Sequence, residues 1–168
     1  GQAGRVYSSD EFPDIHETPI PLWQLANLKN YDTIGVQFSR GCPFNCEFCD
    51  IIELFGRVPR SKTVPQMLAE LQALHDAGYR GHVDFVDDNL IGNKKAVKAF
   101  LPALKDWLEA HDYPFEFTTE ASLNLADDDE LLRLMYEANF VGVFMGIESP
   151  DPETLVQMRK KQNTRRSI

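Results

Sequence analysis

The chain has 168 residues, of which 43% are apolar and 26% charged, and its formal net charge is −9. This make-up is that of a folded globular protein long enough for one hydrophobic core, and it excludes a disordered tail and a coiled coil. The acidic balance also argues against a general nucleic-acid binder, which needs a basic surface to displace counterions from phosphate.

No stretch approaches the roughly 18 consecutive apolar residues of a membrane span, and the first residues lack the pattern of a secretion signal. We therefore expect a cytoplasmic protein with no membrane span. Its three cysteines, Cys42, Cys46 and Cys49, lie within eight positions and cannot build a disulfide framework. Such clustering indicates a metal centre in a reducing compartment.

Residues 1–30 contain three prolines among polar and acidic residues, which predicts an extended lead-in or interdomain linker. Leu22, Trp23 and Leu25 are apolar residues of this segment that we expect to dock on the domain. The domain itself is predicted to span residues 31–168.

The first regular element is a strand, predicted where Ile34, Val36 and Phe38 alternate with other residues. The cysteine loop follows it. A helix is then predicted to begin at Thr63, which forms a capping-box pattern with Gln66, and to end at Gly78.

A second strand over residues 83–86 leads into Asp87-Asp88-Asn89, and a second helix begins near Asn93. Pro102 lies inside that helical pattern and predicts a kink or a late start. Residues 115–119 form the third predicted strand, and Asp127 is expected to cap a third helix. Residues 141–147 form the fourth strand, and Asp151 caps a last helix.

Strands separated by helices indicate an α/β fold with a parallel sheet of βα units. A closed eight-stranded barrel typically needs about 250 residues, so this chain supplies an open sheet or part of a barrel. Ligands bind at the carboxyl ends of such strands. We therefore expect the cysteine loop and the polar residues after the other three strands to gather at one edge.

The cysteine loop has the spacing CxxxCxxC, short enough to place three thiolates around one metal centre. Thiolates suit iron–sulfur clusters and zinc, and both a structural zinc site and a ferredoxin cluster take four ligands. No fourth cysteine is present. A distant histidine, among His16, His75, His82 and His111, would complete a zinc site, but none has paired-ligand spacing. We favour a cluster, because the loop follows a strand and three other strands end in polar residues able to hold a ligand.

One dense basic stretch stands near the end of the chain, formed by Arg159, Lys160, Lys161, Arg165 and Arg166. We interpret it as the solvated end of a helix in preference to an anion site.

The CxxxCxxC loop, with the aromatic Phe48 before its last cysteine, resembles the signature of the radical S-adenosylmethionine (SAM) superfamily. The resemblance implies a 4Fe-4S cluster held by Cys42, Cys46 and Cys49, with the fourth iron open to SAM. In that family an electron from the cluster cleaves SAM to methionine and a 5′-deoxyadenosyl radical. The protein orients the cofactor and excludes water.

The resemblance also suggests SAM contacts at the strand ends. Asp87-Asp88-Asn89 stands where the family places a motif that receives the SAM amino group, although that motif is usually of the glycine-glycine-glutamate type. A helix cap or a solvated strand end is the structural alternative for the acidic residues at the next two strand ends. The implied cofactor-binding residues are Phe48, Asp87, Asp88, Asn89, Glu120, Ser122 and Glu148.

The resemblance runs from about Tyr31 to the end and implies a truncated (β/α)6 partial TIM barrel of about four strands. The lead-in resembles the linker after a cobalamin-binding domain, in a bacterial branch related to the hopanoid methylases. This implies an enzyme that methylates or otherwise modifies an unreactive carbon of a small-molecule or lipid substrate. Cobalamin would be held by a domain outside this chain, and an electron donor such as flavodoxin or ferredoxin would reduce the cluster.

Two alternatives remain at this point. The first is a non-catalytic module in which zinc or an iron–sulfur cluster only staples the loop after the first strand. The second is a piece of an enzyme that folds but cannot act alone, because missing strands leave a sheet edge open. The substrate is not identified by the sequence.

Overall fold

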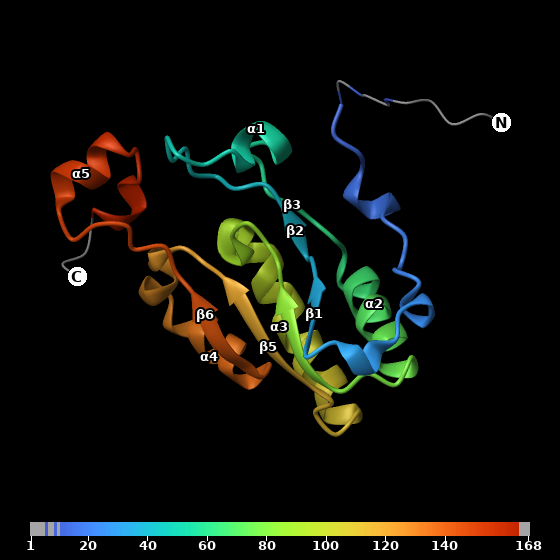
Figure 1. Ribbon diagram of the computed structural model, residues 1–168. Coiled ribbons are helices and arrows are strands. Elements are labelled where there is room, and N and C mark those ends of the chain that lie inside the picture. The colour runs from blue at the N-terminus through green and yellow to red at the C-terminus, as the bar shows by residue number, and fades with distance from the viewer. Residues whose placement is uncertain (1–5, 7–8, 10, 165–168) are drawn as a thin grey trace.

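The computed structural model describes residues 6, 9 and 11–164 (Figure 1). Arg165 and Arg166 of the basic stretch lie outside the described residues. Within the described part, no helix combines the length and the apolar composition needed to cross a membrane.

Four parallel strands form the main sheet, in the order β1-β4-β5-β6. They span Thr33–Val36, Gly81–Phe85, Phe115–Glu120 and Phe140–Phe144. The predicted parallel sheet of βα units is confirmed. The first and last strands are shorter than expected, because the chain bends after Val36 into a small antiparallel pair, β2 (Ser39–Arg40) and β3 (Arg60–Ser61), and leaves the sheet after Phe144.

Three helices cover one face of the sheet, namely α2 (Val64–Asp76), α3 (Lys94–Ala110) and α4 (Asp129–Glu137) (Figure 1). Two short helices, α1 (Ile51–Phe55) and α5 (Pro152–Gln157), lie beyond the carboxyl edge of the strands. Single 3-10 turns occur at Ile15–Glu17, Trp23–Leu25, Leu28–Asn30, Leu90–Asn93, Leu123–Asp127 and Lys161–Asn163.

The core lies between the helices and the sheet, where alternate strand residues such as Val83, Phe85 and Phe117 are fully buried. The opposite face of the sheet is polar. There the Thr118 hydroxyl donates to Asp84 Oδ1 at 2.6 Å and lies 2.8 Å from His82 Nε2. Among the described residues, the helices therefore cover one face of the sheet.

The helix starts follow the predicted caps with one correction. Thr63 and Gln66 form the expected capping box, and Asn93 accepts a hydrogen bond from the Ala96 amide. The third helix is capped by Asp128 and not by Asp127, because Asp127 closes the preceding 3-10 turn.

Pro102 lies in the middle of α3, which begins at Lys94 without delay. The late start proposed for this helix is therefore wrong. Gly78 follows α2 with a φ of +86°, the left-handed conformation typical of a residue that ends a helix.

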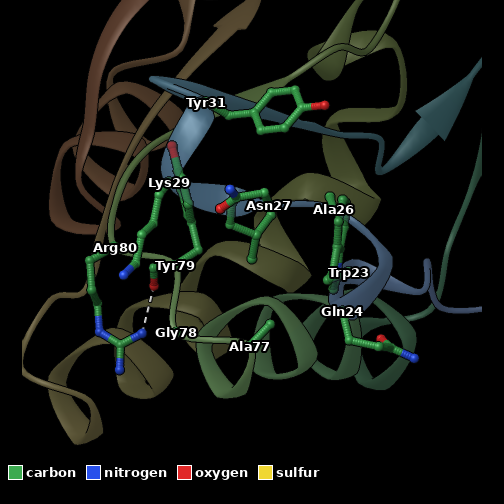
Figure 2. A pocket seen from close by; sticks show the side chains of 11 residues that line it. Trp23, Gln24, Ala26, Asn27, Lys29, Tyr31, Ala77, Gly78, Tyr79 and Arg80 are labelled. Carbon is green, nitrogen blue, oxygen red and sulfur yellow. Dashed lines mark hydrogen bonds between the residues drawn. The ribbon is translucent and has the colours of Figure 1, made fainter.

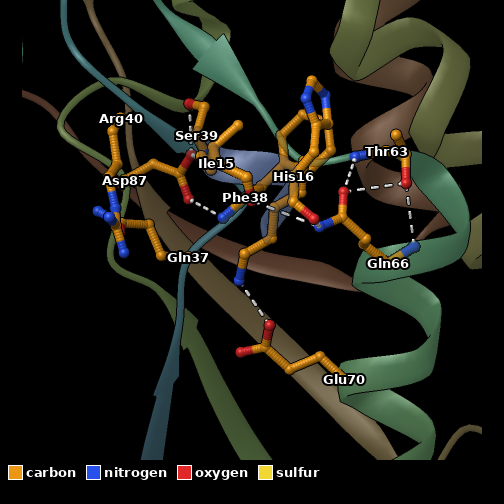
Figure 3. A network of polar contacts seen from close by, with 11 residues as sticks. Ile15, His16, Gln37, Phe38, Ser39, Arg40, Thr63, Gln66, Glu70 and Asp87 are labelled. Atoms are coloured by element: carbon orange, nitrogen blue, oxygen red, sulfur yellow. Dashed lines mark hydrogen bonds and ion pairs between the residues drawn. The ribbon is translucent and has the colours of Figure 1, made fainter. Parts of the chain in front are cut away.

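The lead-in packs on the rest of the chain through one of the three residues expected and through a residue that was not expected. Trp23 contacts the core, but Leu22 and Leu25 are exposed. Ile15 is buried instead, and the Gln66 side chain donates to the His16 carbonyl at 2.8 Å (Figure 3). The capping box of α2 therefore also fastens the lead-in.

Candidate functional site

One cavity of about 190 Å³ lies at the carboxyl edge of the sheet and draws on the loops after all four strands. Eight of the ten residues predicted for the site line it; Cys42 and Asp87 do not. The lining consists of Cys46, Phe48, Cys49, Asp88, Asn89, Glu120, Ala121, Ser122, Phe144, Gly146, Glu148, Lys160 and Gln162. Because the carboxyl ends of parallel strands lie at one edge of the sheet, the fold brings together residues up to about a hundred positions apart in the chain.

Gly41 fixes the start of the cysteine loop. Its φ is +96°, and a Cβ placed there would approach the Gly56 carbonyl oxygen to 2.9 Å. The Cys42 amide donates to that same carbonyl at 3.3 Å. Only glycine fits this close approach of two backbone segments, so Gly41 acts as a turn residue.

Asp87 anchors the backbone just before the loop. Its carboxylate accepts hydrogen bonds from the amides of Phe38 and Ser39 and from the Ser39 hydroxyl, at 2.9, 2.5 and 2.6 Å (Figure 3). Asp87 is 1% exposed, and this burial raises its pKa to about 6 despite the three donors. The structure therefore places Asp87 in the wall behind the site and not on the cavity.

Asp88 and Asn89 continue the anchoring toward the cysteines. Asp88 accepts from the Gly41 amide at 2.9 Å, while the Asn89 amide donates to Ser122 Oγ at 3.1 Å. The same Asn89 amide lies 3.8 Å from Cys42 Sγ. Three consecutive residues after β4 thus hold the cysteine loop at three successive points.

The three cysteines are free and partly exposed. Burial raises the pKa of the Cys42 thiol, and the neighbouring Cys46 and Cys49 add to the shift. The Gln162 amide points to Cys46 Sγ at 3.5 Å. Among the described residues, no group of three or more His, Cys, Asp or Glu side chains stands in an arrangement that could hold a metal ion.

None of the four histidines lines the cavity. Each has a polar neighbour elsewhere: Asp14 for His16, Arg80 for His75, Thr118 for His82 and the Trp107 carbonyl for His111. A donor set of three thiols with no histidine fits a cluster with three protein ligands better than a four-ligand zinc site.

Lys160 is the charged cavity residue that the sequence interpretation missed, besides the uncharged Ala121, Phe144 and Gln162. It is only 9% exposed, and its Nζ lies 2.5 Å from Glu148 Oε1 and 5.4 Å from the centre of the Phe48 ring. Its assignment to a solvated helix end is therefore wrong. The reason is a left-handed turn at Arg159 (φ +57°), which reverses the chain after α5 and directs the next residue inward.

Three acidic residues, Asp88, Glu120 and Glu148, form another part of the cavity wall. The pKa of Glu120 is raised, first by burial and then by the charges of Asp84 and Asp88. Glu148 adopts a left-handed φ of +67°, and a Cβ on Gly146 would collide with both Glu148 Oε1 and Lys160 Nζ. The cavity therefore offers one ammonium group, several carboxylates and an exposed aromatic ring within a small space.

A larger cavity of about 760 Å³ lies at the opposite, amino edge of the sheet (Figure 2). It is formed by the lead-in and the turn between α2 and β4, with Trp23, Lys29, Tyr31 and Arg80 among its lining residues. None of the predicted site residues reaches it.

A parallel βα sheet that carries a three-cysteine loop and a polar cavity at its carboxyl edge is typical of an α/β core that binds a ligand at its strand ends. The sequence model of the Radical SAM superfamily matches residues 36–168. The chain belongs to this superfamily.

Relatives place the chain among methyltransferase-like sequences. It is 54% identical over 168 residues to an uncharacterized methyltransferase of Synechocystis, covering 100% of this chain and 31% of that protein. It is 44% identical over 158 residues to a hopanoid C-2 methylase of Rhodopseudomonas palustris, covering 94% of this chain and 30% of that protein. The chain thus spans about a third of the length of these relatives.

A solved structure shows the same fold. The radical SAM methyltransferase TsrM from Kitasatospora setae, determined with cobalamin and a [4Fe-4S] cluster bound, superimposes with a TM-score of 0.69 at 20% identity. The match covers 82% of this chain and 27% of that one.

Proposed function

We propose that the chain is the core of a radical SAM enzyme, in which Cys42, Cys46 and Cys49 hold a 4Fe-4S cluster and SAM occupies the adjoining cavity. The observation that carries the proposal is the gathering of the strand-end residues around one cavity beside the cysteine loop. Residues 31–168 would form this core, and residues 1–30 its lead-in. The cluster, when bound, would supply the electron that cleaves SAM to the 5′-deoxyadenosyl radical.

The cavity residues match the groups that SAM presents. Phe48 is 54% exposed and offers a face for the adenine ring. Glu120 and Asp88 would accept from the amino group or the ribose hydroxyls, since the two oxygens of a carboxylate can accept from both hydroxyls of a ribose at once. Lys160 carries the one ammonium group on the described cavity wall. It would release Glu148, its ion-pair partner in this structure, and bind the SAM carboxylate instead.

The reaction we propose is methylation of an unreactive carbon. Support comes from the methyltransferase relatives and from the fold shared with a cobalamin-binding methyltransferase. Cobalamin would be bound by a part of the protein outside this chain, and the substrate would be a small molecule or a lipid. The cluster would receive its electron from a donor protein such as flavodoxin or ferredoxin.

The test is anaerobic reconstitution with iron and sulfide, followed by electron paramagnetic resonance of the reduced protein with and without SAM. We expect about four irons per chain and a spectrum that changes when SAM is added. Cys46→Ala should lose the signal, whereas Tyr136→Ala, at a residue that is 82% exposed, should keep it. One tightly bound zinc and no cluster would refute the proposal and favour a structural metal module.

A further inference from the structure

A groove of about 530 Å³ lies beside the cysteine loop and shares one lining residue, Gln162, with the proposed SAM cavity. It forms where this loop meets the end of α5, a contact secured by the Glu47 amide, which donates to the Met158 carbonyl at 3.0 Å (Figure 1). We call it the outer groove. It is lined by Pro43, Phe44, Asn45, Arg57, Val156, Arg159, Lys161 and Gln162.

The outer groove carries positive charge, although the chain as a whole has a net charge of −9. Arg57, Arg159 and Lys161 are exposed, and no carboxylate stands among the described residues that line it. None of the three forms an ion pair with a carboxylate in the described part of the chain, although Arg57 donates to the Pro43 carbonyl at 3.0 Å. A local field of this sign attracts an acidic partner and speeds its association.

Arg159 occupies a backbone position that favours glycine. The Arg159 and Lys160 amides donate to the carbonyls of Val156 and Leu155, a hydrogen-bond pattern in which the left-handed residue after the helix is usually glycine. An arginine here costs folding free energy that glycine would not. A local cost at an exposed position indicates that the side chain has a use outside the fold.

The outer groove also lies close to the proposed cluster. Gln162 lines both the groove and the SAM cavity, and its amide is 3.5 Å from Cys46 Sγ. Asn45 lies next to that cysteine in the chain. A partner seated in the groove would therefore be separated from a cluster thiolate by a single side chain.

We propose that the outer groove is the docking site of an acidic one-electron donor protein, an inference that rests on the proposed function. Phe44 and Val156 supply an apolar floor, and arginines supply the rim, a composition typical of protein interfaces. In the step served by this contact, one electron leaves the donor, which is oxidised, and reduces the cluster by one electron. No covalent bond changes.

The test measures reduction of the reconstituted cluster by stopped-flow absorbance, with reduced flavodoxin as the probe and the methyl viologen radical cation as a positively charged small-molecule reductant. Charge reversal by Arg57→Glu, Arg159→Glu and Lys161→Glu together should slow reduction by flavodoxin about tenfold at low salt. The same variant should react with the methyl viologen radical cation at no less than the wild-type rate, because the reversed charges attract a cation. Added salt should slow the wild type and spare the variant.

Lys29→Glu is the matched control, because it reverses one exposed charge at the amino-edge cavity (Figure 2). It should leave both rates unchanged. Arg159→Gly distinguishes the effect of the charge from an effect on stability. It should raise the melting temperature, because glycine suits the left-handed backbone, and it should slow reduction by flavodoxin about twofold, because one positive charge is lost.

An unchanged flavodoxin rate in the triple variant would overturn the docking site, as would equal slowing by Lys29→Glu. Slowing with both reductants would also overturn it, because the defect would then lie in the cluster and not in the contact. Failure of the proposed function looks different: the wild type itself would then assemble no SAM-responsive cluster.

Discussion

Replacing Asp87 by alanine should destabilise the protein in a pH-dependent way. The change leaves two buried backbone amides, those of Phe38 and Ser39, without their acceptor. Each unpaired buried donor costs about 1–3 kcal/mol, but removing a buried carboxylate returns part of its desolvation cost. At pH 7 we expect a net loss of about 2 kcal/mol in the free energy of unfolding.

Acidification should increase this loss. Burial raises the folded-state pKa of Asp87 to about 6 from 3.8, so the folded protein binds the proton more tightly than the unfolded chain. The resulting stabilisation is fully present below pH 4 and is lost as the pH rises through 6. Between pH 7 and pH 4.5 the wild type should therefore gain about 2 kcal/mol relative to the variant.

Urea denaturation at a series of pH values measures this difference. Asp88→Ala is the comparison, because it removes one hydrogen bond, to the Gly41 amide, and should cost about 1 kcal/mol. A difference between wild type and Asp87→Ala that shrinks on acidification would refute the reasoning, since burial of the carboxylate would then not dominate its pKa.

Three further outcomes follow from the site and its support. Gln162→Leu removes the amide donor to Cys46 Sγ and should lower the cluster's midpoint potential by about 40 mV, the equivalent of about 1 kcal/mol for one electron, measured by redox titration. Gly146→Ala should push apart the ion pair that lines the cavity and weaken SAM binding about tenfold by calorimetry, while the iron content stays at the wild-type level. Lys62→Met leaves the buried Glu70 carboxylate without its ion-pair partner and should lower the free energy of unfolding by about 3–5 kcal/mol, measured by thermal or urea denaturation. The double variant Lys62→Met, Glu70→Leu should recover most of this loss.

The sheet and the position of the site could be predicted because their signals are local. Period-two apolar patterns marked the strands, cap residues marked the helices, and the parallel βα topology then placed every strand end at one edge. Glu120 and Ser122 reach the cavity for that reason, whereas Phe48 was expected there from the resemblance of the cysteine loop. A single-residue error at the Asp127 cap did not disturb this arrangement.

The remaining features depend on tertiary contacts that have no local signature. Asp87 and Asp88 are neighbours of the same type, yet Asp87 is buried against the amides of Phe38 and Ser39, whereas Asp88 lines the cavity while it accepts from the Gly41 amide. In the sequence, Lys160 is one lysine of a basic run and shows no sign of burial. Its inward direction depends on the left-handed backbone of Arg159. The β2–β3 pair was missed because two-residue strands are too short to show a period.

Asp87, Asp88 and Asn89 anchor the cysteine loop, so the conformation of the loop does not depend on a bound metal. Small metal-binding domains commonly fold only when the ion arrives, because the ion supplies most of their stability. Here, hydrogen bonds from the neighbouring strand end hold the loop, and the large apolar core lies on the helix-covered face of the sheet. Loss of the cluster to oxygen would therefore leave the protein folded, and iron and sulfide would rebuild the cluster without refolding of the chain.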